Sequence, residues 1–187
     1  MAFIVVLVSP EAARAQAVAD VRNCADADSV VGPRTDLQRR AQIRRWRHPD
    51  GREFVRTGTR RPSASGLMVM VSWTPELGAD DAFGQLEILV PPRLVLREGI
   101  ERDTVFIEID DWMKAPLGPP TPPILLGARL PPYLPMSVAL DMVDVGLLAR
   151  AKDASVRYAG RTFGFSETDL AEVNALYRVV RCAGGPA

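Results

Sequence analysis

The chain has 187 residues, and its 23 Lys and Arg residues balance 23 Asp and Glu residues, so the formal net charge is zero. This balance gives no general attraction to nucleic acids or to membrane surfaces. A chain of this length buries about two-thirds of its unfolded surface, so we expect one domain that folds without a metal or a cofactor. We predict an α+β fold: an antiparallel, β-rich, sandwich-like domain over residues 34–187, with two helices in its C-terminal half.

The first 17 residues have the pattern of an export signal. The apolar run MAFIVVLV (residues 1–8) is followed by a break at Ser9-Pro10 and by small residues around Ala15-Gln16-Ala17. We interpret residues 1–17 as a signal peptide and residues 18–33 as an N-terminal arm, which predicts a periplasmic or secreted protein. No Lys or Arg precedes the apolar run, so the alternative is a buried first strand of a cytoplasmic structural domain. No segment is long and apolar enough to predict a transmembrane span.

The chain has two cysteines, Cys24 and Cys182. If cleavage follows Ala17, each cysteine lies close to one end of the mature chain. Two cysteines in an exported protein predict one disulfide bond, Cys24–Cys182. Two unrelated thiols in a cytoplasmic protein are the alternative.

The first half of the domain reads as a short helix followed by strands. His48-Pro49-Asp50-Gly51 is predicted to be a tight turn, because Pro49 opposes a helix at His48 and Asp-Gly suits a hairpin loop. Before this turn we predict a helix over Arg34–Arg47. After it we predict strands at Arg52–Thr57, Leu67–Trp73, Leu86–Val90, Arg93–Leu96 and Thr104–Ile109.

The second half begins with a proline-rich stretch. Residues 116–135 hold half of the prolines, so we expect either a functional or mobile loop, or an irregular edge that packs Ile124–Leu126 into the core. The spacing of Met136, Leu140, Val143 and Leu147 predicts a helix over Met136–Ala149. A hairpin that places Val156 opposite Phe163 follows. The last helix opens at Ser166, an N-cap residue with Asp169 three positions on.

The layout of Leu67–Leu176 resembles the invasion-associated locus B type of periplasmic protein. The similarity rests on an apolar strand pair with GQLEILVP (residues 84–91), on LREGI (96–100), and on a strand ending in Ile109-Asp110-Asp111. A helix, a Gly160-Arg161-Thr162-Phe163 hairpin and a last helix complete it. The resemblance implies a β-rich envelope protein with no assigned catalytic residues.

The sequence contains one carboxylate pair that is a candidate for catalysis. His48 is the only histidine, which excludes multi-histidine metal sites within this chain, and it reads as a solvated loop residue. Asp110 and Asp111 form the best carboxylate pair. One interpretation is that they only form a turn. The alternative is an enzyme in which Asp110 or Asp111 is catalytic and a nearby arginine (Arg47, Arg56 or Arg61) stabilises charge. Adjacent strand residues point to opposite faces, so the two aspartates need not share a site.

Charge is divided unevenly along the chain. Residues 34–61 hold ten arginines against three carboxylates, a formal +7, and residues 76–111 hold ten carboxylates against three arginines, a formal −7. The two segments either compensate each other as neighbours, or the basic one binds an anion. The second interpretation predicts a non-enzymatic protein that binds a partner protein or an anionic envelope component, and no nucleic acid. Its predicted anion-binding residues are Arg39, Arg40, Arg44, Arg45 and Arg47.

Overall fold

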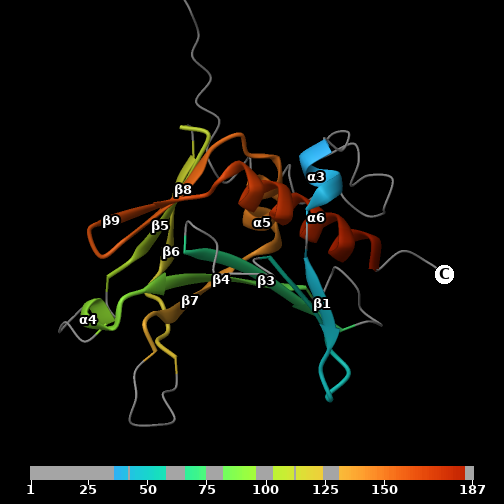
Figure 1. Cartoon of the computed structure of the whole chain (residues 1–187), viewed down its shortest axis with the longest axis horizontal. Coiled ribbons are helices and arrows are strands. Elements are labelled where there is room, and N and C mark those ends of the chain that lie inside the picture. Colours follow the sequence, from blue (N-terminus) through green and yellow to red (C-terminus); the bar gives the residue numbers. More distant parts are fainter. Residues whose placement is uncertain are drawn as a thin grey trace, which may run out of the picture.

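The computed structural model describes residues 36–41, 43–57, 66–74, 82–95, 103–111, 113–123 and 131–183. The predicted signal peptide and arm lie outside these ranges and stay predictions. Within them, two antiparallel sheets pack with helices from the C-terminal half of the chain (Figure 1). The predicted α+β, antiparallel, β-rich fold is therefore confirmed.

The larger sheet has five strands in the order β1-β2-β3-β4-β7, and each neighbouring pair is antiparallel. Its strands are β1 (Arg44–Arg47), β2 (Glu53–Arg56), β3 (Leu67–Trp73), β4 (Phe83–Val90) and β7 (Leu134–Leu140). The two most apolar predicted strands, β3 and β4, lie at its centre, where both edges of each strand are paired. β1 and β7 are the outermost strands of this sheet in the described part of the chain.

The smaller sheet has four strands in the order β6-β5-β8-β9. Its strands are β5 (Val105–Ile109), β6 (Met113–Gly118), β8 (Ala154–Tyr158) and β9 (Arg161–Gly164). The predicted pairing of Val156 with Phe163 is confirmed in the β8–β9 hairpin. The smaller sheet occupies the upper left of Figure 1, above β7.

Two helices cover one face of the larger sheet. α5 (Met142–Arg150) packs against α6 (Glu167–Ala183), and α6 also contacts β2 and β3. The predicted cap of α6 is confirmed: Ser166 Oγ accepts the Asp169 N–H (3.2 Å), and the Asp169 carboxylate accepts the Ser166 N–H (2.8 Å). Figure 1 shows both helices on the same side of β3 and β4, with the one-turn helix α3 (Asp36–Arg40) beside α6. In the described ranges, no helix has the length and apolarity that a bilayer span requires.

The core forms between this face of the larger sheet, the helices and the smaller sheet. Alternate strand residues are buried, as the period of two along a strand requires. The buried side chains form one continuous cluster to which both sheets and both long helices contribute. Its largest members include Trp73, Leu86, Ile107, Met136 and Tyr177. In the described part of the chain, both sheets therefore share one core.

The helix predicted over Met136–Ala149 is wrong in its first half. Residues 134–140 form β7, which pairs with β4 along its whole length. α5 begins only after Asp141, whose carboxylate accepts the Asp144 N–H at 2.8 Å. Pro135 is compatible with β7 because this strand is at the edge of the larger sheet.

The helix predicted over Arg34–Arg47 is also wrong in its second half, since the helical part ends at Arg40 and Arg44–Arg47 form β1. The strand predicted at Arg93–Leu96 is instead the short helix α4 (Pro92–Val95). Pro92 suits the first position of a helix, where its missing N–H costs nothing.

The proline-rich stretch begins with regular structure. β6 continues through Pro116 to Gly118, and Thr121 exchanges two backbone hydrogen bonds with Ser137 of β7 (2.6 and 2.9 Å). The loop predicted over 116–135 is therefore partly an added segment at the edge of the larger sheet. Ile124–Leu126 lie outside the described residues.

Candidate functional site

The candidate site is the hairpin of β1 and β2, which the predicted turn at His48–Gly51 closes. The His48 carbonyl accepts the Gly51 N–H (2.9 Å), and the His48 N–H donates to the Arg52 carbonyl (2.8 Å). Gly51 has φ of 92°, a conformation that favours glycine. The Asp50 carboxylate accepts the Arg52 N–H (3.0 Å), and this hydrogen bond is the main reason why its pKa is lowered. The turn therefore fixes the register of the two strands.

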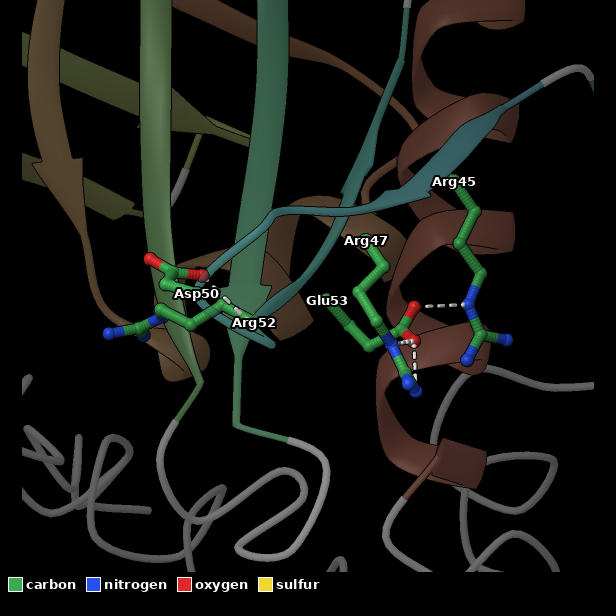
Figure 2. Close-up of polar contacts among 5 residues, drawn as sticks. All are labelled: Arg45, Arg47, Asp50, Arg52 and Glu53. Atoms are coloured by element: carbon green, nitrogen blue, oxygen red, sulfur yellow. Dashed lines mark hydrogen bonds and ion pairs between the residues drawn. The ribbon is translucent and has the colours of Figure 1, made fainter.

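On one face of the hairpin, two arginines share one carboxylate. Arg45 Nε lies 3.0 Å from Glu53 Oε2, and Arg47 Nε and Nη2 each lie 2.8 Å from Glu53 Oε1 (Figure 2). The hydrogen bond from Arg45, followed by that from Arg47, lowers the pKa of Glu53. The carboxylate therefore stays ionised at neutral pH, and the three side chains together carry a net charge of +1.

The carboxylate is hidden and the guanidinium groups are open to solvent. The Glu53 side chain is 9% exposed, whereas those of Arg45 and Arg47 are 54% and 64% exposed. Glu53 points to the same face as the core residues of β3, directly opposite buried Trp73. Arg45 also lies over the Trp73 ring (5.6 Å to its centroid). An approaching ligand therefore meets positive charge first.

Aromatic rings stiffen the other face of the hairpin. Trp46 stacks on Phe54, with ring centroids 5.4 Å apart and planes 14° from parallel. Arg44 lies 5.9 Å from the centroid of the Trp46 ring, and the His48 ring lies 5.9 Å from that of Phe54. Such cross-strand aromatic pairs stabilise a two-stranded hairpin. The aromatic pair thus stabilises the hairpin conformation in which the β1 arginines are exposed.

The five predicted anion-binding residues fall into two groups. Arg44, Arg45 and Arg47 lie together on β1, and each is exposed. Arg40 is exposed in α3, and the Arg39 side chain lies outside the described residues. Neither the role of Glu53 as the shared counter-ion nor the Trp46–Phe54 stack was predicted from the sequence. A usable sequence signal was that polar and aromatic residues alternate on both sides of the turn, as Arg45-Trp46-Arg47 before it and Glu53-Phe54 after it. Such alternation indicates two strands with a polar face and an aromatic face.

Glu53, the counter-ion of Arg45 and Arg47, lies in the same arginine-rich segment, residues 34–61, as these two arginines. An electrostatic interaction with the acidic segment, residues 76–111, occurs elsewhere on the larger sheet. Arg56 and Glu87 lie on the face opposite to α5 and α6, separated by β3, since Arg56 pairs with Met70 and Glu87 with Met68. The positive charge of Arg56 lowers the pKa of Glu87, but burial of the half-buried Glu87 raises it more. Among the described residues, this attraction between Arg56 and Glu87 links the two segments away from β1.

Glu87→Gln is expected to stabilise the protein at pH 7. The raised pKa means that ionisation of Glu87 disfavours the folded state, so wild-type stability falls as pH rises from the unfolded-state pKa through the folded-state pKa. Thermal unfolding should show a higher Tm for the variant at pH 7 and a smaller difference at pH 4. Glu108→Gln is the control with the opposite sign, because a hydrogen bond from Lys114 lowers the pKa of Glu108. A lower Tm for Glu87→Gln at pH 7 would mean that attraction to Arg56 outweighs burial.

The carboxylate pair Asp110 and Asp111 forms the turn between β5 and β6. Both residues have positive φ (50° and 57°), and Asp110 Oδ1 accepts the N–H groups of Lys152 and Asp153 (2.8 and 2.9 Å). Asp110 therefore ties this turn to the segment before β8. Neither aspartate has an arginine among its hydrogen-bond or ion-pair partners in the described ranges. Arg61, one of the arginines considered with them, lies outside those ranges.

Two further sequence predictions concern metal binding and the disulfide. No group of three or more His, Cys, Asp and Glu residues suited to a metal occurs among the described residues. Cys182 is exposed in the last turn of α6, and Cys24 lies outside the described ranges. The Cys24–Cys182 bond therefore stays a prediction.

Comparisons of this chain with protein-family models, with curated proteins and with solved structures found no match.

Proposed function

We propose that this protein is an exported, non-enzymatic envelope protein that binds an anionic partner through the arginines of the β1–β2 hairpin. The observation that carries the proposal is the pair of exposed guanidinium groups that converge on the single, hidden carboxylate of Glu53. The proposed location rests on the signal-like residues 1–17 and on the resemblance to periplasmic proteins of the invasion-associated locus B type.

The hairpin retains donors for a ligand after Glu53 has been satisfied. Arg45 gives only its Nε to Glu53, and Arg47 gives its Nε and Nη2. The remaining terminal nitrogens project from exposed side chains, and Arg44 adds a third exposed guanidinium from the opposite face of β1. Planar guanidinium groups bind carboxylates and phosphates with paired hydrogen bonds, which suits an anionic partner.

The double change Arg45→Glu/Arg47→Glu should lower the affinity for an anionic probe by about 10–100-fold, because each basic residue near an anionic surface contributes about 1 kcal/mol. The probes are vesicles containing phosphatidylglycerol and, separately, poly-L-glutamate, each at low and at physiological salt. Arg45→Gln/Arg47→Gln should give a smaller loss without crowding three carboxylates together. Circular dichroism and Tm show whether each variant is folded.

Arg157→Glu/Arg161→Glu is the matched control. These arginines are exposed on β8 and β9 of the smaller sheet, and their replacement changes the net charge by the same amount. It should leave binding nearly unchanged. The proposal fails if wild type binds neither probe at low salt, or if the control weakens binding as much as the β1 variant does.

A further inference from the structure

Within the described part of the chain, the outer edge of β1 is an unpaired sheet edge. β1 pairs with β2 on one side, and no described strand lies on its other side. The arginine side chains along this strand are exposed. An open edge exposes backbone N–H and C=O groups that can pair with another strand.

The turn geometry identifies which residues direct their backbone outward. The His48 N–H bonds to the Arg52 carbonyl, so His48 and Arg52 form a hydrogen-bonded pair. Such pairs alternate along an antiparallel ladder, which places Trp46 and Arg44 in the next bonded positions toward β2. Arg45 and Arg47 therefore direct their N–H and C=O groups away from β2, toward the open edge.

Arg45 and Arg47 thus supply both the backbone groups that face the open edge and the positively charged side chains beside it. An added strand would place alternate residues directly opposite Arg45 and Arg47, with side chains on the same face as theirs. We infer that the anionic partner is an extended protein segment with carboxylates at alternate positions, which adds as an antiparallel strand beside β1. This inference rests on the proposed function and names its ligand class.

Charge and backbone pairing favour an acidic protein segment at this edge over the two alternatives, a second copy of the chain and a lipid surface. A second copy pairing through β1 would bring arginines directly opposite arginines, and like charges in these positions are destabilising. A lipid surface would satisfy the guanidinium groups but would offer no backbone partner for the N–H and C=O groups of Arg45 and Arg47. An acidic strand satisfies both sets of groups, as in other cases of strand addition to a sheet edge.

The probe is a capped octapeptide of alternating Glu and Thr, compared with its isomer Glu-Glu-Thr-Thr-Glu-Glu-Thr-Thr. Both have the same charge, but only the alternating peptide, as a strand, places two carboxylates two residues apart on one face, opposite Arg45 and Arg47. We expect the alternating peptide to bind at least about tenfold more tightly, since one or two additional hydrogen bonds account for such a difference. Fluorescence anisotropy measures both affinities with the full chain.

N-methylation of the peptide tests the backbone contacts without changing charge. In an antiparallel added strand, the residues opposite Arg45 and Arg47 exchange hydrogen bonds with them. Methylation of the Glu nitrogens should therefore abolish the preference for the alternating peptide, whereas methylation of the Thr nitrogens should leave it. A loss confined to the Glu nitrogens supports strand addition, and equal effects of the two sets, or a loss confined to the Thr nitrogens, overturn it.

The outcomes separate this inference from the proposed function. If both isomers bind equally and Arg45→Glu/Arg47→Glu weakens both, strand addition is wrong while anion binding by the hairpin stands. If that variant binds both peptides and the anionic vesicles as wild type does, the proposed function itself is wrong. Wild-type binding of phosphatidylglycerol vesicles but of neither peptide would overturn the protein-segment inference in favour of a lipid surface.

Discussion

Gly84→Ala is expected to lower the free energy of unfolding by about 3 kcal/mol, the upper end of the usual cost of overpacking a core. Gly84 lies on the buried face of β4, opposite Leu140 of β7. A Cβ atom there would lie 2.7 Å from the Leu140 carbonyl oxygen and 3.0 Å from Val145 Cγ2. The oxygen belongs to the β4–β7 ladder and the methyl group to α5, so relief of the overlap would displace a strand or a helix.

Urea unfolding monitored by circular dichroism measures this loss, and Tm should fall by roughly 6–12 °C for a domain of this size. Gly164→Ala is the matched control, because a Cβ on this exposed residue of β9 would meet no atom within 4 Å. Its stability should stay within about 0.5 kcal/mol of wild type. Equal stability of the two alanine variants would mean that β7 and α5 can move away from β4 at little cost.

The parts of the fold that the sequence predicts well are determined locally. The β8–β9 hairpin combines apolar residues in register with a turn at Ala159-Gly160, where both residues have positive φ. The cap of α6 involves two side chains three residues apart, Ser166 and Asp169. The turn, the register and the cap that were predicted depend on residues close together in the chain, so the local pattern is sufficient for them.

β7 illustrates why other parts could not be predicted in this way. Met136 and Leu140 are four residues apart, and this spacing fits one face of a helix and one face of a strand equally well. The alternation of buried residues through Leu134 and Val138 favours a strand, but Pro135 argues against a central one. β7 is the outermost strand of its sheet and pairs along its whole length only with β4, which resolves the conflict, and this pairing joins residues about fifty positions apart in the chain.

The arginines of the candidate site were predicted from the sequence, but their positions relative to one another and to Glu53 were not. Arg44, Arg45 and Arg47 were selected as a basic group within an expected helix, in which they would not have alternated between two faces. In β1, Arg45 and Arg47 share one face and Arg44 the other, and register brings Glu53 opposite Arg47. The counter-ion, and the net charge that remains, depend on strand pairing, which composition does not encode.

Arg178→Ala should lower the free energy of unfolding by about 3 kcal/mol, through a lost hydrogen bond and a cavity. Arg178 is 2% exposed, and burial lowers the pKa of its guanidinium group. Its Nε donates to Asn174 Oδ1 (2.9 Å), and Asn174 Nδ2 donates to the Ala149 carbonyl at the end of α5 (2.8 Å). The chain of hydrogen bonds thus joins the two helices that cover the larger sheet.

Two further variants separate packing from hydrogen bonding in this link between α5 and α6. Arg178→Met fills most of the space but leaves buried Asn174 Oδ1 without the Arg178 donor, so we expect a loss of about 1–2 kcal/mol in urea unfolding. Arg150→Ala removes an exposed arginine whose Nε donates to the Gly146 carbonyl within α5 (3.3 Å), and it should cost less than about 0.5 kcal/mol. If Arg178→Met is as stable as wild type, the buried guanidinium contributes mainly by filling space. In that case the contact between α5 and α6 depends on its apolar side chains, with Tyr177 packed against Gly146 as the main candidate, because a Cβ on Gly146 would lie only 3.1 Å from the Tyr177 ring.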